Sequence, residues 1–499
     1  MIELRSVEQV RAAEEAEFRV VPEGALMQRA AHALAIRCTR LLDEVRGGVV
    51  GARIVLLVGS GNNGGDALWA GERLARRGCR VDALLVADRA HEQGLAALVA
   101  AGGRVHRGAA QQGTLLADAD LVLDGILGIG GRGGLRPQAA EVVEQVAASG
   151  AIVVAVDVPS GVDADTGAVD GAAVDADVTV TFGAIKPGLL LAPGMFHSGA
   201  VDLVDIGLEF DDVPPAALVM EPVDVAVRVL EPVDGDYKYS RGVVGLAVGS
   251  AEYRGAAVLA VAAARHANVG MVRLLDRRDG VADMVVERFP DVVVDGTAPA
   301  RQPRATSWAC GSGFPGTADD EAVVLAVLDA QAPVVLDAGA LTVVSVSDAV
   351  RRRLAERTRE GHVTVLTPHD GEFERLRPGL LAAAAGRLEA ARQAASDLDC
   401  IVVLKGAGTV IAGPSGPAFI DAEGTADLGV AGSGDVLTGI LGSLLACADP
   451  DDAVATVAAG VWLHGCAGRL AAHRAPVTAL DIADRVTDAV RTARFGVIT

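Results

Sequence analysis

The chain has 499 residues, enough for two or three domains, and 51% of them are hydrophobic although only 3% are aromatic. A core of alanine, valine and leucine is typical of α/β proteins, in which buried parallel strands are β-branched and helices are rich in alanine. The net charge is −21, and no stripe rich in lysine or arginine offsets it, which argues against a nucleic-acid partner.

The cysteines and the N-terminus limit the class of protein further. The six cysteines are scattered and form no Cys-x-x-Cys pair, so we expect reduced core residues and neither disulfides nor zinc ligands. The N-terminus lacks a signal-peptide core, and no apolar run reaches the length of about 18 residues that a membrane helix needs. We therefore expect a soluble, cytoplasmic homo-oligomer that binds small molecules, with no membrane and no nucleic acid as partner.

The first half of the sequence alternates helices and strands. The pattern Ser6-x-x-Gln9 is a capping box that predicts a first helix, and a second helix is expected at about residues 23–45. This alternation predicts a doubly wound, Rossmann-like α/β domain with a largely parallel sheet. Apolar runs predict its strands at residues 54–58, 81–86, 121–123, 152–156, 178–182 and 201–206.

Segments rich in proline and acidic residues, at 210–215 and 231–236, interrupt the alternation as linkers do. A second strand–helix series begins with the apolar run 243–250 and ends in a helix near residues 481–494. Because the halves share no repeat of fixed period, we predict two different α/β domains. The predicted boundaries place the first domain at residues 1–215, a linker at 216–235 and the second domain at 236–499.

The turn after the first predicted strand is the most informative segment, residues 59–66. A glycine-rich turn from strand to helix lets the backbone approach a ligand closely and points N–H groups at an anion. Gly59, Gly61 and Gly64 meet the dinucleotide fingerprint, and Asp82 lies near the position of a ribose-binding acid. Against that alternative, Asp66 is expected in the first helical turn, where a carboxylate would repel a pyrophosphate.

Three later strand ends, in residues 123–134, 155–163 and 181–188, are also rich in glycine and polar residues. Ligands of open α/β sheets bind beyond the carboxyl ends of the strands. One such loop is ordinarily a tight turn with a capping acid, whereas four together predict a single site. The polar residues expected to converge there are Asn63, Asp124, Asp157, Ser160 and Lys186.

The motifs at these four strand ends resemble those of the NAD(P)H-hydrate epimerase family. They are G-x-G-N-N-G-G-D, D-G-I-L-G-I-G, V-D-V-P-S-G and T-F-G-A-x-K-P-G, and the resemblance covers about residues 1–210. It implies a potassium ion bound by Asn63, Asp124 and Ser160, whose oxygen atoms suit an alkali cation. It also implies that Asp124 is the acid/base at the hydrated nicotinamide ring.

The same resemblance implies a set of substrate-binding residues on two glycine-rich loops and one strand end. Ala67 stands where the family commonly has glycine, but this departure removes none of the implied ligands. The implied substrate-binding residues are Asn62, Asn63, Gly64, Gly65, Asp66, Gly128, Ile129, Gly130, Gly131, Arg132, Gly133, Gly134 and Asp157.

The second half carries a glycine-rich segment, residues 431–439, that leads into a helix expected at 436–446. Glycines at a helix N-terminus form an anion site, and Asp435 beside it can take a proton from a hydroxyl while N–H groups stabilise phosphoryl oxygens. In isolation, a turn with Asp435 as the helix cap explains the same pattern. Three companion strand ends, in residues 310–313, 366–372 and 404–409, favour a phosphoryl-transfer site.

This half resembles ribokinase-like small-molecule kinases and, more closely, the ADP/ATP-dependent NAD(P)H-hydrate dehydratase family, over about residues 236–499. The shared motifs include T-P-H-x-G-E, L-K-G and G-S-G-D, whereas Gly339 stands where the family usually has the second aspartate of D-A-D-A-L. The resemblance implies Mg²⁺ on the phosphates of ADP or ATP, with Glu372 near the metal, and leaves the choice of nucleotide open. The implied nucleotide-binding residues are Lys405, Gly406, Ala407, Gly408, Thr409 and Gly434, and the implied substrate-binding residues are Ala256, Gly313, His369 and Asp435, the last also being catalytic.

Together the two resemblances predict a fused enzyme that repairs hydrated NADH and NADPH. The first domain would interconvert the R and S epimers of the hydrate. The second would use a nucleotide to dehydrate the S epimer to NAD(P)H and would release phosphate. Two alternatives stay open: a ribokinase-like kinase of a vitamin or sugar alcohol with an attached nucleotide-binding domain, and a first domain that is a non-catalytic nucleotide sensor.

Overall fold

The computed structural model describes residues 1–107, 112–131, 133–210, 213–277, 279–296, 299, 304–473 and 475–496. The chain divides into two compact units, one formed by Glu3–Ala216 and the other by Met1–Ile2 together with Ala217–Thr499. Across the described ranges, none of the helices combines the length and the apolar character that crossing a bilayer requires.

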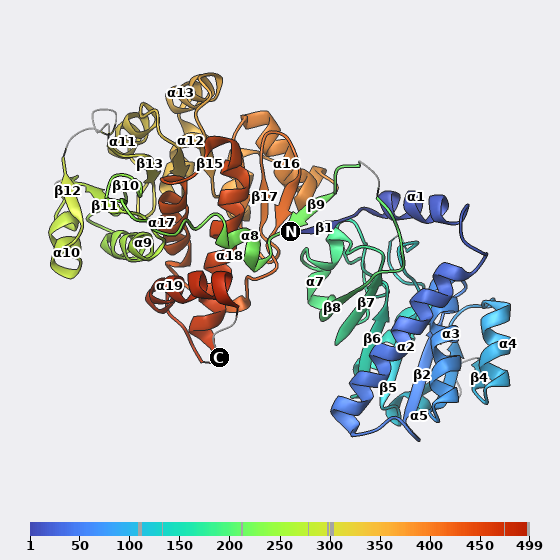
Figure 1. Ribbon diagram of the computed structural model, residues 1–499. Coiled ribbons are helices and arrows are strands. Elements are labelled where there is room, and N and C mark those ends of the chain that lie inside the picture. Colours follow the sequence, from blue (N-terminus) through green and yellow to red (C-terminus); the bar gives the residue numbers. More distant parts are fainter. Residues whose placement is uncertain are drawn as a thin grey trace. The chain divides into compact units, whose positions relative to one another are not determined.

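The first unit is built on a seven-stranded sheet whose neighbouring strands all pair in parallel (Figure 1). Each predicted strand of this half is present, with its ends shifted by a residue or two, and β4 is an addition at the edge. In order across the sheet the strands are β4 (Arg104–Arg107), β3 (Arg80–Leu85), β2 (Arg53–Val58), β5 (Leu121–Gly125), β6 (Ile152–Val156), β7 (Val178–Phe182) and β8 (Ala200–Val204).

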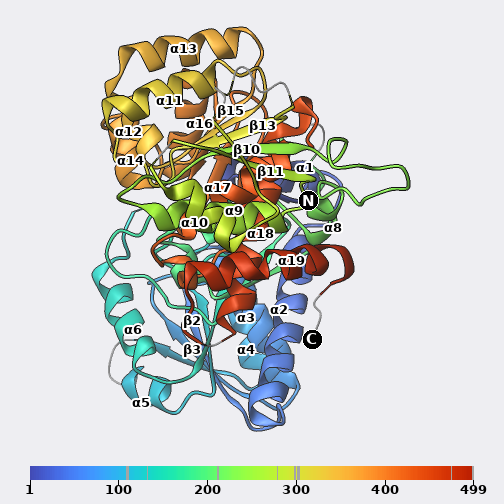
Figure 2. The ribbon, with the colours of Figure 1, turned by 90° about the vertical axis from the view of Figure 1, so that its left-hand side faces the viewer.

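Helices cover both faces of this sheet. The helices of this unit are α1 (Val7–Glu17), α2 (Ala25–Arg46), α3 (Asn62–Arg76), α4 (Glu92–Ala100), α5 (Gln112–Ala117), α6 (Pro137–Ala147) and the short α7 (Met195–Ser198). Figure 2 shows α5 and α6 on one side of β2 and β3, and α2, α3 and α4 on the other. The predicted capping box of the first helix is confirmed, because Ser6 Oγ accepts the Gln9 N–H at 3.2 Å and Gln9 Oε1 accepts the Ser6 N–H at 3.0 Å.

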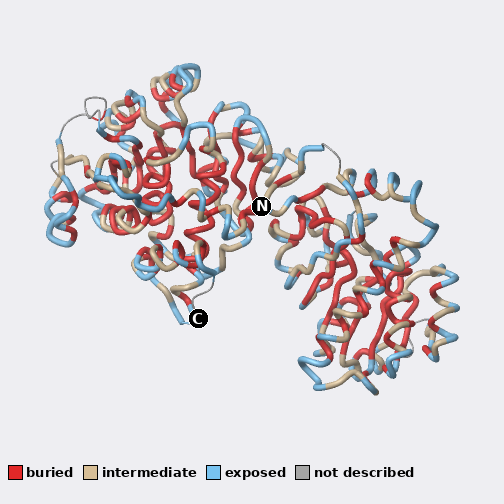
Figure 3. Tube along the Cα trace, in the orientation of Figure 1, coloured by how far each residue is buried: buried red, intermediate tan, exposed pale blue. Residues whose placement is uncertain are grey.

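Alternate residues of β2 pack against the two helical layers, as the period of a strand requires. Ile54 and Leu56 join the cluster that contains α2 and α3, whereas Val55 and Leu57 pack with α6. The strands at the centre of the unit are buried along their length (Figure 3). Both faces are therefore closed, and the carboxyl ends of the strands are where a ligand can reach the sheet.

The second unit contains an eleven-stranded sheet, and the run from β12 to β16 pairs in parallel. At the other end, β17 is antiparallel to β16 and β18. In order across the sheet the strands are β1 (Ile2–Leu4), β9 (Ala217–Val219), β18 (Ala418–Ile420), β17 (Val410–Ala412), β16 (Ile401–Leu404), β15 (Thr364–Leu366), β14 (Val334–Leu336), β13 (Ser307–Cys310), β10 (Val243–Ala247), β11 (Met271–Leu275) and β12 (Val293–Asp295).

Two helical layers also enclose this sheet. The helices are α8 (Pro222–Ala226), α9 (Arg254–His266), α10 (Val281–Arg288), α11 (Ala318–Leu328), α12 (Gly339–Val346), α13 (Asp348–Arg359), α14 (Asp370–Leu376), α15 (Leu380–Ala383), α16 (Arg387–Leu398), α17 (Ser433–Leu445), α18 (Ala453–Ala472) and α19 (Ala479–Phe495). Val244 and Leu246 of β10 pack with α9 and α17, whereas Trp308 and Leu336 pack with α11 and α12. Residues 216–235, expected to be a linker, include β9 and α8 of this unit.

Candidate active sites

Four glycine-rich loops of the first unit leave neighbouring strands, as predicted, because β2, β5, β6 and β7 are consecutive in the sheet. The loop after β2 enters α3, whose N-cap is Gly61. A Cβ atom at Gly59 would stand 1.9 Å from the Ile126 carbonyl oxygen, so this close approach of two loops requires glycine. Asp66 is the fifth residue of α3 and lies in its second turn, not in the first turn that the sequence predicts.

These loops, together with α1 and the start of α2, line a cavity of about 1250 Å³. The volume exceeds that of pockets for drug-sized ligands and suits a dinucleotide. Gly64, Gly65 and Gly134 pack against the protein, Gly133 borders a second cavity of about 100 Å³, and Arg132 lies outside the described residues. The predicted substrate-binding residues that line the large cavity are Asn62, Asn63, Asp66, Gly128, Ile129, Gly130, Gly131 and Asp157.

Asp124 and Ser160 form a buried hydrogen-bonded pair near the cavity. Ser160 Oγ donates to Asp124 Oδ1 at 2.7 Å, and the Ser160 N–H donates to Asp124 Oδ2 at 2.8 Å. Burial raises the pKa of Asp124 to about 6, although these bonds oppose the rise. Asp124 is fully buried, whereas Ile126 and Leu127, which follow it in the same loop, line the cavity.

Asp157 and Lys186 form a second buried pair, and both line the cavity. Lys186 Nζ donates to Asp157 Oδ1 at 2.6 Å and to Thr181 Oγ1 and the Phe182 carbonyl, each at 3.0 Å. Asp157 has a φ of +69°, a conformation that costs a non-glycine residue about 1–3 kcal/mol. The strained backbone and the lysine together fix the direction of this carboxylate.

Two further carboxylates, Asp66 and Glu14, line the same cavity. Burial raises the pKa of Asp66 well above its ordinary value, and the charges of Asp157 and Glu14 add to the rise. Among the described residues, Asp66 Oδ1 and Asn63 Nδ2 are buried without a hydrogen-bond partner, so both can bind a ligand. Glu14 is a site residue that sequence reasoning missed, because α1 lies far along the chain from every motif.

The dinucleotide-fingerprint alternative needs Asp82 at the end of a strand. Asp82 is instead the third residue of β3, where it is buried within the sheet. Its Oδ2 accepts from Arg104 Nη2 at 2.6 Å, and His106 Nε2 lies 2.7 Å from its Oδ1. These two partners occupy the carboxylate, so it is not placed to bind a ribose.

Asp337 is the centre of the polar cluster in the second unit. Its Oδ1 accepts from Lys405 Nζ at 2.8 Å and from Thr367 Oγ1 at 2.7 Å. Its Oδ2 accepts from Thr438 Oγ1 at 3.0 Å and from Ser312 Oγ at 3.2 Å. Burial opposes the negative charge, but the charge and hydrogen bond of Lys405, together with the bonds from Thr367 and Thr438, outweigh it and lower the pKa of Asp337. The sequence places Asp337 in a motif without assigning it a role, because its donors come from four separate segments.

The first turn of α17 lies beside this cluster, with Gly434 and Asp435 in the predicted position. Burial, followed by the charge of Asp337, raises the pKa of Asp435 to about 6. Ser433 Oγ lies 3.0 Å from His464 Nε2, and burial lowers the pKa of His464 to about 4, so this imidazole is neutral. The turn therefore offers N–H groups for an anion beside an acid that is ionised at neutral pH.

The turn at His369 and the side chain of Lys405 complete the cluster. His369 Nδ1 accepts the N–H groups of Gly371 at 3.0 Å and Glu372 at 3.3 Å, so Nε2 carries the proton, and it lies 3.5 Å from Glu372 Oε1. Glu372 Oε2 accepts the His369 N–H at 2.8 Å and lies 3.7 Å from Lys405 Nζ. Burial disfavours the charge of Lys405, but Asp337 and Glu372 raise its pKa, so the ammonium group is a fixed positive charge.

The remaining predicted residues of this half surround the same strand ends. A Cβ atom at Gly313, which has a φ of +74°, would stand 2.7 Å from the Ala256 Cβ, so the two predicted substrate-binding positions are in contact. Within the turn 405–409, Thr409 Oγ1 accepts the Gly406 N–H at 3.2 Å and donates to the Gly406 carbonyl at 2.9 Å. The turn is therefore closed on itself.

Packing explains why the segment after Asp337 differs from the sequence D-A-D-A-L that is usual in the family. A Cβ atom at Gly339 would stand 2.2 Å from the Phe314 carbonyl oxygen, so an aspartate does not fit without a shift of the backbone. Ala338 has a φ of +48°, an uncommon conformation for alanine that turns the chain into α12. In this protein the first aspartate of the motif, Asp337, carries the charge at this position.

Comparisons with known proteins agree with the two-unit arrangement. A family model described as YjeF-related protein N-terminus matches residues 23–188, and one described as NAD(P)H-hydrate dehydratase matches residues 244–488. The bifunctional NAD(P)H-hydrate repair enzyme of Mycobacterium tuberculosis is 45% identical over 454 residues, 89% of each chain, and that of Mycobacterium leprae is 42% identical over 494 residues, 98% of each chain. A crystal structure of ADP/ATP-dependent NAD(P)H-hydrate dehydratase from Bacillus subtilis, co-crystallised with ATP and Mg²⁺, is 28% identical and covers 57% of this chain and 99% of its own, with a TM-score of 0.46.

The fold and the two polar clusters define an α/β enzyme with a separate candidate active site in each unit. The identity shared with relatives over nearly the whole chain specifies the family. The chain belongs to the bifunctional NAD(P)H-hydrate repair enzymes.

Proposed function

We propose that the large cavity of the first unit is an epimerase site and that the Asp337 cluster of the second unit is a dehydratase site. The family acts on hydrated NADH and NADPH, so we propose this reaction rather than a kinase reaction or a nucleotide-sensor role. The observation that carries the assignment is the cavity wall, where acidic side chains meet glycine-rich loops at consecutive strand ends.

The residues expected to hold potassium fit that ion. Asp124 is a buried carboxylate whose pKa rises through burial, so a bound cation would offset an electrostatic cost. The loop after β5 contacts the other two residues. A Cβ atom at Gly128 would stand 2.8 Å from Asn63 Oδ1, so Asn63 lies against this loop, and Leu127 of the same loop donates its N–H to Ser160 Oγ at 2.9 Å. Asn63, Asp124 and Ser160 would therefore hold the ion, which would supply positive charge next to the substrate loop.

We assign proton transfer at the nicotinamide ring to Asp66, in place of Asp124. Asp66 lines the cavity, and burial raises its pKa well above the ordinary value, which favours the protonated acid. Asp66 gives this proton to the C6 hydroxyl, the C6–O bond breaks, and water leaves while the ring nitrogen stabilises the carbon. Water then adds to the opposite face, and the Asp66 carboxylate recovers a proton from it, which restores the acid and yields the other epimer.

In the dehydratase site the adenine nucleotide would contact residues 405–409 and Gly434, and the hydrate would contact Ala256, Gly313 and His369. Lys405 supplies a positive charge, and the first turn of α17 supplies N–H groups for phosphoryl oxygens. The Mg²⁺ ion would enter on the nucleotide phosphates and neutralise part of their charge, with Glu372 nearby. ADP and ATP are both compatible with these contacts.

Asp435 is the proposed base of the dehydration. Its carboxylate takes the proton of the C6 hydroxyl, whose oxygen attacks the terminal phosphorus while the bond to the bridging oxygen breaks. The phosphate on C6 then leaves with the bonding electrons, and loss of a proton from C5 forms the C5–C6 double bond of NAD(P)H. Phosphate is a far better leaving group than hydroxide, which explains the use of a nucleotide.

A reciprocal pair of variants tests both assignments in one chain. Asp66→Asn should slow epimerisation about 100-fold and leave dehydration of the S epimer unchanged, whereas Asp435→Asn should do the opposite. Epimer exchange is followed by chromatography and dehydration by the absorbance of the reduced nicotinamide. Near-normal dehydration by Asp435→Asn would exclude its role as base, and normal epimerisation by Asp66→Asn would return the acid role to Asp124.

A further inference from the structure

The main chain of Lys405 lies between the two substrate segments of the second unit. β16 ends at Leu404, and the Lys405 N–H donates to the Pro368 carbonyl at 2.9 Å. The Lys405 carbonyl accepts from Arg387 Nη2, also at 2.9 Å. The start of the proposed nucleotide turn is therefore held on one side by the segment that carries His369 and on the other by an arginine to which no motif assigns a role.

The guanidinium of Arg387 also bonds to the segment that carries His369, through Asp370. Arg387 is the first residue of α16, and its Nη1 donates to Asp370 Oδ1 at 2.6 Å. Asp370 follows His369, so one side chain touches both the nucleotide turn and the hydrate turn. The Arg387 side chain is 15% exposed and its Nε is buried, so the guanidinium is largely shielded from solvent, although Asp370 is exposed.

The residue after Lys405, Gly406, packs against the same guanidinium. A Cβ atom at Gly406 would stand 2.7 Å from Arg387 Nη2, so the turn packs directly against the arginine. The planar guanidinium presents donors in two fixed directions, whereas a lysine ammonium is a point charge on a flexible stem. A lysine at 387 therefore keeps the charge but does not hold both partners in the same geometry.

We propose that Arg387 is a positioning residue of the dehydratase, which keeps the nucleotide turn 405–409 in register with the His369–Asp370 turn. The proposal rests on the proposed function of this site. Without the guanidinium the nucleotide turn loses one of its two main-chain anchors at Lys405, so the nucleotide should bind less tightly. The chemical groups that perform the reaction stay in place.

The test compares Arg387→Lys, Arg387→Met and Asp370→Asn in the full chain, using S epimer with ADP and with ATP. Both Arg387 variants should raise the KM for the nucleotide about tenfold and leave kcat within about threefold. Asp370→Asn removes the charge of one of the two partners and should raise the KM about threefold. Arg375→Met, an exposed residue of α14, is the matched control and should match the wild type.

Calorimetry of the same preparations reports the amount of folded second unit, and epimerase activity reports the amount of folded first unit. A merely structural role for Arg387 would lower kcat through loss of active enzyme and leave the KM for the nucleotide unchanged. That result, or a KM within twofold of the wild type in both Arg387 variants, would overturn the proposal. A wild type without nucleotide-dependent dehydration would instead contradict the proposed function, so the two failures are distinguishable.

Discussion

Two carboxylates of the dehydratase site differ in charge state because their surroundings differ. Asp337 accepts hydrogen bonds from three hydroxyl groups and from the ammonium of Lys405, and its pKa is lowered despite burial. Asp435 is next to the negative charge of Asp337, and burial together with that charge raises its pKa to about 6. A permanently ionised acid thus organises the site, and an acid that titrates near neutral pH is left for proton transfer.

This difference predicts the pH dependence of dehydration. Asp435 accepts a proton only when it is ionised, and its raised pKa keeps it protonated up to about pH 6. The rate of the first turnover should therefore rise with pH through about 6 and level off above 7. Rapid-mixing measurements at saturating nucleotide and hydrate check this, and a rate that is flat between pH 5 and 7 would contradict the role of Asp435 as base.

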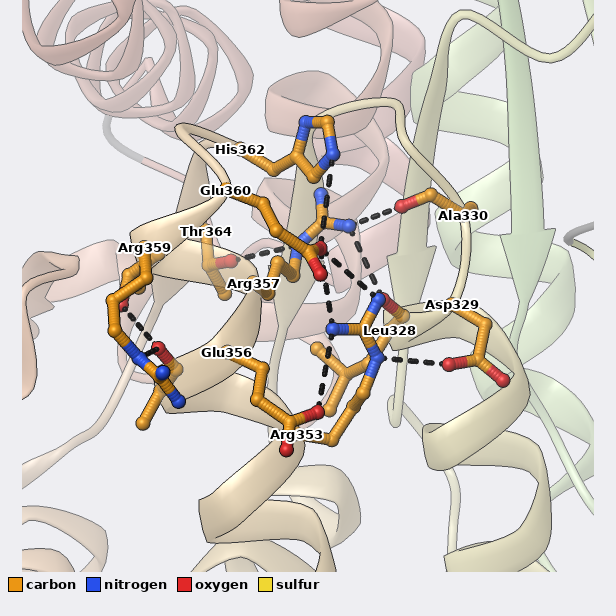
Figure 4. Close-up of polar contacts among 12 residues, drawn as sticks. Leu328, Asp329, Ala330, Arg353, Glu356, Arg357, Arg359, Glu360, His362 and Thr364 are labelled. Atoms are coloured by element: carbon orange, nitrogen blue, oxygen red, sulfur yellow. Dashed lines mark hydrogen bonds and ion pairs between the residues drawn. The ribbon is translucent and has the colours of Figure 1, made fainter.

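At the scale of elements, α13 is anchored by Arg357, an arginine that is fully buried and has no carboxylate partner in the described part of the chain. Figure 4 shows its guanidinium directed toward main-chain carbonyls and the hydroxyl of Thr364. It donates to the carbonyls of Leu328 at 3.3 Å and Val363 at 3.2 Å, to those of Ala330 and Ala332, and to Thr364 Oγ1 at 3.0 Å. The arginine thereby joins the end of α11 to the start of β15, at the amino ends of the strands, whereas the site lies at their carboxyl ends.

Replacing this arginine should cost stability. Arg357→Met leaves several buried carbonyls without donors and should lower the free energy of unfolding of the second unit by about 3 kcal/mol. Arg359→Met, which alters an exposed arginine of the same helix, should change it by less than about 0.5 kcal/mol. Calorimetry of both variants measures the difference, and equal melting temperatures would show that the Arg357 network adds no stability.

The predictable elements were those whose apolar pattern matches their burial. β2 and β10 are continuous apolar runs buried on both faces, so the pattern alone indicates them. β4, with the sequence Arg-Val-His-Arg, is a half-exposed edge strand without such a run. β9 and α8 lie beside prolines and acids that predict a linker, but tertiary contacts recruit them into the second unit.

Candidate site residues could be proposed from the sequence where they stand in a glycine-rich motif, and were missed where packing brings in a distant segment. Asn63 and Asp157 stand in glycine-rich motifs whose loops follow β2 and β6 of the first sheet, and Asp435 stands in such a motif at the start of α17 in the second unit. Glu14 on α1 and Arg387 on α16 reach the sites only through the fold. No spacing in the sequence relates them to their partners.

At the scale of the whole molecule, one architecture is used twice. Each unit places glycine-rich loops at the carboxyl ends of consecutive parallel strands, with buried acids among them. The sequences of the two units match different family models, so the sites are not copies of one another. Joining the activities in one chain is useful because dehydration would consume only one epimer, and the epimerase would convert the other into it.

The central claim is that this chain performs both reactions, and the extent of repair of an epimer mixture tests it most directly. Purified protein is given a mixture of R and S hydrate with Mg²⁺, K⁺ and either ADP or ATP, and the absorbance of the reduced nicotinamide is followed to its end point. The rate at which the epimers exchange in buffer without protein serves as the control. The account predicts that the wild type restores all of the hydrate at a rate well above this control. A wild type that converts only the S fraction rapidly, and then converts the R fraction at the control rate, would contradict it.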